Sequence, residues 1–519
     1  MNIEKPSFEE TPQEQKAPST RKEKGFGGVS EKDFSFEAPD VLKTLRFPEG
    51  TKIEYIGNAT SDFQAEPLLF DDKGRPMVFS DWEMELAKKI KGKSSKIVGE
   101  PGAVADLPNF RKFKEDYVRR SAELGENMFR FSLDFARLCP GVGEFNEQLM
   151  ADYVKTLALA RAHNLEPMLA IYHWPMPKYL LTLDQEDNIK VGGWENPDVA
   201  KHFRFYVENV VRYLSDEDKV RAVLKSQGFT KDAQDQFLAE GLVRYFLSIN
   251  EPTSILFPGY LAGAFPPFKK GDIFAFKKVL SELVNAHDIA YNEIKTGKLK
   301  SRSGEPQVGV GHNWVYFDGV LGKVLDAITN RGITKKFERT GAHSDFLGLQ
   351  YYFRMTVPRF SRRGKSYGDH PDFGDIYPPG ILPLLKNMNQ QYPQKDIFVT
   401  EFGFSDRKDA RRPYWIMETV RYILEAKKQG VPIKGMLLWS LVNNFEWARG
   451  MEQKFGLFDE RELKEPLKPS SAGELRSWEA WAAVARAIHQ PSDENVAALQ
   501  KIYENSKAQF SAGSQEKKI

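Results

Sequence analysis

Two short apolar segments, far apart in the chain, each present a glutamate at the point where they stop. The first reads Phe246-Leu247-Ser248-Ile249-Asn250-Glu251-Pro252, and the second reads Ile397-Phe398-Val399-Thr400-Glu401-Phe402-Gly403. Both have the composition of a buried β-strand, which Pro252 or Gly403 then ends. Either glutamate alone could cap a neighbouring helix or pair with an arginine. Brought together by the fold, the two could supply the pair of carboxyl groups that cleaves a glycosidic bond.

Polar and aromatic residues also stand at the ends of other strand-like segments. Each has a simpler explanation, such as a buried ion pair for Arg130, a hydrogen-bonded core histidine for His173 or core packing for Trp439. Their joint placement still favours an active site, because the carboxyl ends of the strands in a barrel share one rim. The set comprises Arg130, His173-Trp174, Asn250-Glu251, Tyr351-Tyr352, Glu401, Trp439 and Glu446-Trp447.

The elements that must position these residues alternate along the chain. Eight apolar strands separated by amphipathic helices predict an α/β fold, a single (β/α)₈ TIM barrel with long strand-to-helix loops. An open doubly wound sheet is the alternative, but the chain has no G-x-G-x-x-G after its first strand and no P-loop. The expected strands are 53–58, 127–133, 167–172, 244–249, 307–311, 346–351, 396–400 and 435–439. The expected helices include 113–124, 150–163, 200–214, 274–295 and 413–429.

We expect the barrel to occupy residues 46–505. Residues 1–45 are rich in Glu, Lys, Pro and Ser without periodicity, and 506–519 are similar, so loosely packed tails are predicted at both ends. Residues 215–240 form a charged helical insertion between a helix and the next strand. Such connections lie on the face of a barrel opposite the active site, whereas the strand-to-helix loops wall the pocket.

Composition argues against several classes of function. A formal charge of +2, from 74 basic and 72 acidic side chains, favours neither nucleic acid nor an anionic membrane as partner. The single cysteine, Cys139, allows no intramolecular disulfide, and the eight scattered histidines show no metal-ligand spacing, so neither a metal nor a cofactor is expected. There is no apolar segment typical of a signal peptide or a membrane span, and a cytoplasmic location is the expectation.

Taken in order, these motifs resemble the family-one glycoside hydrolases, the β-glucosidase-like and β-galactosidase-like retaining enzymes. The resemblance covers about residues 55 to 460, which is nearly the whole folded region. The matching motifs are Ala59-Thr60-Ser61-Asp62-Phe63-Gln64, Phe129-Arg130-Phe131-Ser132, His173-Trp174, Ile249-Asn250-Glu251-Pro252, Leu349-Gln350-Tyr351-Tyr352, Val399-Thr400-Glu401-Phe402-Gly403, Trp439-Ser440-Leu441-Val442-Asn443-Asn444-Phe445-Glu446-Trp447 and Lys454-Phe455-Gly456-Leu457.

The resemblance implies a role for each matching residue. Glu251 would be the acid/base and Glu401 the nucleophile, while Asn250 would hold the 2-hydroxyl of the sugar. Arg130 and Tyr352 would be partners of the nucleophile. The glycone-binding set would comprise Gln64, His173, Glu446 and Trp447, with Trp439 as a stacking floor and Phe455 in the pocket wall.

Electrostatics supports the same division of roles. A guanidinium and a phenol would stabilise Glu401 as an anion, and this anion would keep Glu251 protonated until the glycosyl ester forms. Retention requires the two carboxyl groups to be about 5–5.5 Å apart, and we predict that separation. Glu446 would accept hydrogen bonds from sugar hydroxyls and repel a 6-phosphate, which favours neutral hexosides.

Four positions depart from the family pattern. Phe402 and Gln350 each stand where the family usually has Asn, and both are expected to flank the nucleophile and affect the rate. Pro175 and Asn443 each replace an Asp.

The sequence therefore predicts a retaining, exo-acting β-glycosidase for short β-linked glucosides or galactosides. Two alternatives stay open: a transglycosidase that uses a sugar or lipid-sugar acceptor, and a non-catalytic carbohydrate-binding barrel. The glycone (glucose, galactose, fucose or mannose), the aglycone and the oligomeric state also stay open. A basic run in the 353–392 loop is more typical of a solvated loop than of a contact with an acidic aglycone. It comprises Arg359, Arg362, Arg363 and Lys365.

Overall fold

The computed structural model describes residues 52–99, 107–301, 304–338, 344–357, 377–470 and 474–515. The predicted tail at 1–45 lies outside these ranges, and so does the basic run between 359 and 365.

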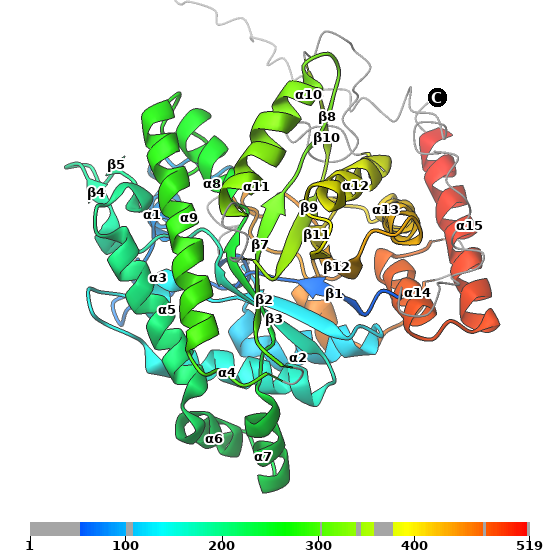
Figure 1. Cartoon of the computed structure of the whole chain (residues 1–519), viewed down its shortest axis with the longest axis horizontal. Coiled ribbons are helices and arrows are strands. Elements are labelled where there is room, and N and C mark those ends of the chain that lie inside the picture. Colours follow the sequence, from blue (N-terminus) through cyan, green and yellow to red (C-terminus); the bar gives the residue numbers. More distant parts are fainter. Residues whose placement is uncertain are drawn as a thin grey trace, which may run out of the picture.

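Eight parallel strands close into a barrel, which confirms the predicted (β/α)₈ fold (Figure 1). Neighbouring strands follow in the order β1-β12-β11-β9-β7-β6-β3-β2, so the first and last strands of the chain pair to close the sheet. The strands are β1 (Tyr55–Ala59), β2 (Met128–Ser132), β3 (Glu166–Tyr172), β6 (Tyr245–Asn250), β7 (Gln307–Asn313), β9 (Phe346–Tyr351), β11 (Asp396–Phe402) and β12 (Ile433–Trp439). Seven of the eight predicted strands differ from these bounds by one to two residues at one or both ends.

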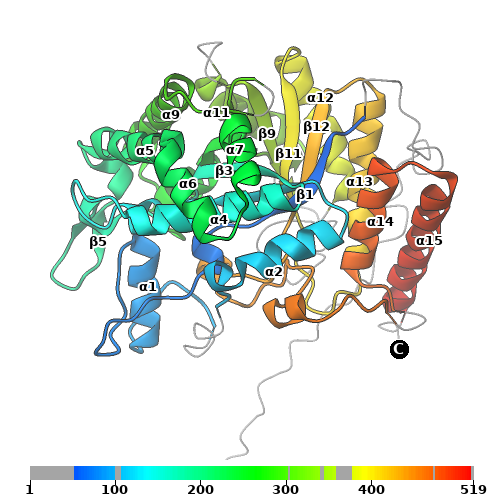
Figure 2. The same cartoon turned by 90° about the horizontal axis from the view of Figure 1, so that it is seen from below.

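Helices surround the barrel and return the chain from the end of one strand to the start of the next (Figures 1 and 2). Several begin at a side chain that accepts a hydrogen bond from a free backbone N–H of the first turn; Asn146 caps α4 and Asp272 caps α9 in this way. The helices that follow the eight strands are α2 (Phe110–Glu123), α4 (Glu147–Ala162), α5 (Val199–Ser215), α9 (Ile273–Thr296), α11 (Gly332–Phe337), α12 (Ile381–Gln391), α13 (Arg412–Lys428) and, after the last strand, α14 (Ser477–His489).

Shorter elements lie in the strand-to-helix excursions. They are α1 (Asp81–Ile90), α3 (Phe135–Leu138), α8 (Pro252–Leu256), α10 (Gly322–Leu325) and the strand pairs β4 (Thr182–Leu183) with β5 (Ile189–Val191) and β8 (Tyr316–Asp318) with β10 (Arg354–Thr356). The predicted insertion at 215–240 contains two helices, α6 (Glu217–Ser226) and α7 (Lys231–Glu240), between α5 and β6. Figure 1 shows them at the bottom of the view, whereas α10, β8 and β10 are at the top.

The C-terminal prediction needs a correction. Helix α15 (Asp493–Gln515) continues well past residue 506, where a loose tail was expected. Phe510 packs against Tyr414 of α13 with ring centroids 5.1 Å apart, and the Gln509 side chain donates to two backbone carbonyls. Tertiary contacts of this kind hold a polar helix that has little tendency to fold alone.

The barrel interior below the site is filled by apolar side chains, including Tyr245, Phe346 and Phe398. Two strands change register just before they reach the rim. In β6 the pairing with β7 shifts between Leu247 and Asn250, and in β11 the pairing with β9 shifts between Val399 and Glu401. A shift of this kind changes which face the next side chain occupies. Asn250 and Glu401 consequently point into the barrel mouth.

Candidate active site

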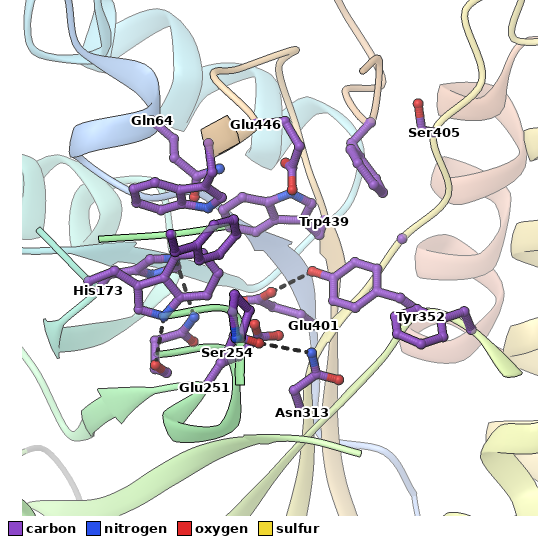
Figure 3. Close-up of a pocket in the computed structure, with 18 of the residues that line it drawn as sticks. Gln64, His173, Glu251, Ser254, Asn313, Tyr352, Glu401, Ser405, Trp439 and Glu446 are labelled. Carbon is purple, nitrogen blue, oxygen red and sulfur yellow. Dashed lines mark hydrogen bonds between the residues drawn. The ribbon is translucent and has the colours of Figure 1, made fainter. Parts of the chain in front are cut away.

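A pocket opens at the barrel mouth, and most of the predicted site residues line it (Figure 3). The cavity, including its open mouth, measures about 860 Å³. The predicted residues in its wall are Gln64, His173, Asn250, Glu251, Tyr352, Glu401, Trp439, Glu446, Trp447 and Phe455. Arg130 is fully buried behind this wall, where it contacts Glu401 and Asn250. The fold thus brings every predicted site residue to one place.

Glu401 is held from two sides by hydrogen-bond donors. Arg130 Nη1 donates to its Oε1 over 2.5 Å. The Tyr352 hydroxyl donates to its Oε2 over 2.5 Å (Figure 3). Burial and the neighbouring charges of Glu401 and Glu251 raise the pKa of Tyr352 well above its usual value, so the phenol keeps its proton and remains a donor. A cation and a phenol in contact with both oxygens stabilise Glu401 as a carboxylate.

Glu251 has the opposite environment. Burial raises the pKa of its carboxyl well above the usual value, and the charge of Glu401 adds to this effect. A hydrogen bond from Ser254 and the charge of Arg130 act in the other direction without reversing the shift. Glu251 therefore keeps its proton beside the carboxyl group that Arg130 and Tyr352 contact, which is the arrangement of an acid beside a nucleophile.

The backbone around the pocket is strained at three residues. Trp174, Glu251 and Trp447 all have positive φ, of 85°, 45° and 50°. Non-glycine residues rarely adopt this conformation, and it occurs where the surrounding structure imposes it, often at functional sites. For Glu251, the backbone N–H donates to Gly311 O over 2.8 Å, and Pro252 then starts α8. These constraints turn the carboxyl group of Glu251 into the pocket.

Stacked rings form one side of the pocket. His173 stacks between Trp439 and Trp447, with ring centroids 5.9 and 6.0 Å away. Burial and the charge of Arg130 lower the pKa of His173 well below its usual value, so the imidazole is neutral. Aromatic faces beside neutral hydrogen-bonding groups suit a sugar, which has apolar C–H faces and a rim of hydroxyls.

Two further polar residues project from this side. Gln64 Nε2 donates to Phe445 O over 2.7 Å, which fixes its amide. Burial and the charge of Glu401 raise the pKa of Glu446 to about 8. At neutral pH the free protein therefore holds Glu446 protonated, able both to donate to and to accept from a hydroxyl.

The four departures from the family pattern have different consequences. The expectation that the Phe402 side chain flanks the nucleophile is wrong, because its ring points outward and packs against Trp415 and Trp481. Asn443 accepts from Gly456 N and donates to Asp459, both over 2.8 Å, and so secures the loop that carries Phe455.

The other two departures lie in the loop after β3 and on β9. Beside Pro175, Met176 N donates to Asp81 over 3.0 Å, which holds the loop after His173. Gln350 does lie at the site: its Nε2 donates to Asn250 Oδ1 over 2.6 Å.

Several residues that line the pocket were not predicted from the sequence. Asn313 Nδ2 donates to Ser254 Oγ over 3.2 Å, beside Glu251 (Figure 3). Asn313 could have been identified from its position at the end of a strand, because β7 continues two residues past the predicted end. Ser254 follows Glu251 by one helical turn, so its spacing could have identified it. The missed residues are Ser254, Pro258, Phe265, Asn313, Phe353, Gly403, Phe404 and Ser405, whereas Trp174, predicted at the rim, does line the pocket.

Within the described residues, no group of three or more His, Cys, Asp or Glu side chains could hold a metal ion. Among the same residues, no helix is both long and apolar enough to cross a membrane.

Curated proteins with similar sequences cover most of the chain. A 1,4-beta-D-glucan glucohydrolase of Thermotoga neapolitana is 24% identical over 458 residues, which cover 79% of this chain and 97% of the relative. Beta-glucosidase 42 of Arabidopsis thaliana is 25% identical over 487 residues, which cover 81% of this chain and 90% of the relative.

Solved structures share the fold. The hyperthermophilic beta-glucosidase from Pyrococcus furiosus superimposes with a TM-score of 0.67 at 22% identity, covering 90% of this chain and 99% of that chain. A family 1 beta-glucosidase from Thermotoga maritima gives 0.63 at 20% identity, covering 86% and 98%. The family model described as Glycosyl hydrolase family 1 matches residues 46–239 and 333–465. Since these two segments make up more than half of the chain, and the barrel and its rim agree with the match, the chain belongs to glycosyl hydrolase family 1.

Proposed function

We propose that this chain is a retaining, exo-acting β-glycosidase that hydrolyses neutral β-linked glucosides or galactosides. The observation that carries the proposal is the unlike state of two carboxyl groups in one pocket. Glu401 accepts hydrogen bonds from Arg130 and Tyr352, each over 2.5 Å, whereas burial and the charge of Glu401 raise the pKa of Glu251. A binding protein would have no need to bury a carboxyl group that keeps its proton beside another that a guanidinium and a phenol contact.

In the first step, a Glu401 oxygen attacks the anomeric carbon while Glu251 gives its proton to the glycosidic oxygen. The bond from the anomeric carbon to that oxygen breaks, the aglycone leaves as an alcohol, and a glycosyl ester forms on Glu401. Arg130 and Tyr352 orient the attacking carboxylate. The neutral His173 and the amide of Gln64 are placed to hold hydroxyls without adding charge.

The second step follows from the change in charge. Once Glu401 is an ester its negative charge is gone, and the main electrostatic contribution that disfavours ionisation of Glu251 disappears with it. Glu251 can then accept a proton from water, whose oxygen attacks the anomeric carbon and releases Glu401. Two displacements at one carbon give net retention, for which we expect the carboxyl groups to be about 5–5.5 Å apart.

The test uses 4-nitrophenyl β-glucoside and β-galactoside with the wild type, Glu401→Gln and the control Glu126→Gln. Glu126 is also a buried carboxyl, but its partners are Asn58, Ser121 and Trp481, outside the pocket. We expect Glu401→Gln to lose about a thousandfold or more in kcat, and the control to retain its activity. The sugar released first should be the β-anomer by NMR. Wild-type turnover that survives in Glu401→Gln, or release of the α-anomer, would contradict the proposal.

A further inference from the structure

Gln350, one of the departures from the family pattern, reaches across the barrel rim to Asn250. It lies on β9, where it is in register with Glu401 of β11 on one side and with Asn313 of β7 on the other. Its Nε2 donates to Asn250 Oδ1 over 2.6 Å. Asn250 belongs to β6, and β7 separates β6 from β9, so this hydrogen bond spans an intervening strand.

Gly311 on β7 leaves the space that the hydrogen bond crosses. A Cβ added to Gly311 would lie 2.8 Å from Gln350 Nε2 and 3.2 Å from Asn250 Oδ1. Both approaches are closer than ordinary van der Waals contact, so a larger residue would displace one of the two amides. A glycine on the middle strand and a long amide on the outer strand together form the bridge.

The bridge determines the orientation of the Asn250 amide. Asn250 Oδ1 accepts from Gln350 Nε2 and from Arg130 Nη2, each over 2.6 Å, which occupies both of its acceptor positions. A flipped amide would place its NH₂ group against these two donors. The Nδ2 of Asn250 is therefore held on the opposite side, 3.3 Å from His173 Nε2 and at the pocket wall.

We propose that Gln350 is a positioning residue, which locks Asn250 across Gly311 so that Nδ2 meets the 2-hydroxyl of the glycone. The inference rests on the proposed function, because it concerns the sugar bound beside Glu401. Hydrogen bonds to the 2-hydroxyl strengthen in the oxocarbenium-like transition state of glycosidases, so orientation at this point affects kcat/KM. Gln350 acts only through Asn250 and is absent from the pocket wall itself.

The experiment compares two substrates that differ only at this hydroxyl, 4-nitrophenyl β-glucoside and its 2-deoxy analogue. Gln350→Met keeps the length of the side chain and removes the donor, and Gln350→Asn keeps the amide and shortens its reach. The matched control is Gln307→Met at the first position of β7, where the amide donates to Glu305 O at the other end of the barrel. Thermal melting of each variant reports its folding.

The ratio of kcat/KM for the glucoside to that for the 2-deoxyglucoside is the readout. Both Gln350 variants should lower this ratio on the order of tenfold, the value of one good hydrogen bond, while turnover of the 2-deoxyglucoside stays close to wild type. Adding either change to Asn250→Ala should lower the ratio no further, because the two residues act as one unit. The control should leave the ratio unchanged.

Other outcomes separate this inference from the proposed function. If the Gln350 variants slow both substrates equally, or add fully to Asn250→Ala, Gln350 only supports the fold and the inference is overturned while the glycosidase assignment stands. If folded wild-type protein turns over neither substrate, the proposed function fails and the inference fails with it.

Discussion

Arg130 and Glu401 form an ion pair over 2.5 Å in which the two side chains are only 0% and 4% exposed. The pair therefore contributes to stability as well as to the proposed chemistry. Burying a guanidinium without a counter-charge is costly, and breaking such a pair by removing one partner typically destabilises a protein by about 3–5 kcal/mol.

Glu401→Ala should accordingly destabilise the fold by about 3–5 kcal/mol, because it leaves the Arg130 guanidinium buried and unpaired. Glu401→Gln keeps one carbonyl oxygen within reach of Arg130 and should destabilise it less. Chemical denaturation of the two variants beside the wild type measures the difference. Equal free energies of unfolding for all three proteins would show that the pair does not support the fold.

Glu251→Gln should slow glycosides with poor leaving groups by about 10²–10⁴-fold, the usual contribution of a general acid. Glycosides whose leaving group departs without a proton, such as dinitrophenyl glycosides, should be affected much less in the first step.

The pH profile gives an independent readout of Glu251. Because its pKa is raised, wild-type kcat/KM should fall as the pH rises through that raised value and Glu251 loses its proton. This basic limb should be absent from Glu251→Gln. A variant that keeps the wild-type basic limb would assign that limb to another titrating group of the pocket, such as Glu446.

Glu446→Ala should raise KM for both glucoside and galactoside more than it lowers kcat, since in the proposed function its carboxyl would contact hydroxyls away from the reacting carbon. With a pKa of about 8, Glu446 is uncharged at neutral pH and becomes charged as the pH passes that value, so inhibition by a 6-phosphosugar should weaken above pH 8. Tighter inhibition at higher pH would exclude a contact with Glu446.

Phe402→Asn restores the usual family residue, yet it should destabilise the protein. The Phe402 ring is fully buried, with centroids 5.9 and 5.8 Å from those of Trp415 and Trp481. Replacing it with a small polar group should reduce the free energy of unfolding by about 3–5 kcal/mol. Activity per folded molecule should be retained, because the ring faces the helices. A stable variant with altered kcat would show that this position does act on the site.

Glu126→Gln should change how stability depends on pH. Burial raises the pKa of Glu126 from 4.5 to about 8, so between these values the folded protein keeps a proton that the unfolded chain has lost. Wild-type stability must then fall as the pH rises through this window. The variant carries no titrating group at position 126, so its free energy of unfolding should decline less between about pH 4.5 and 8. Parallel curves from denaturation at several pH values would contradict this explanation.

The architecture and much of the rim were predictable because both follow from local patterns. Glu251 and Glu401 directly follow apolar runs that match β6 and β11, and the parallel strands of a barrel bring such positions to one rim. The register shifts beneath them were not predictable, because strict alternation does not reveal which position bulges. For the same reason the outward direction of Phe402 emerged only from the structure.

Features that depend on distant segments were also beyond the sequence. The contact of Gln350 with Asn250 requires the neighbouring position Gly311, which belongs to a third strand. At the C-terminus, α15 has a mostly polar composition and is held by Phe510 and Gln509 against residues about a hundred positions earlier. The composition of α15 alone does not indicate those partners.

The closure of the barrel has a consequence for synthesis. Ala59 of β1 is in register with Arg130 of β2 on one side and with Trp439 of β12 on the other. While β12 is still inside the ribosome, the nascent chain lacks Trp439 in the pocket. Strands β1 and β11 are then open sheet edges, which readily pair with other chains. Ribosomes that stall before residue 433 should therefore yield inactive, chaperone-dependent fragments, and activity should arise only after nearly the whole message has been translated.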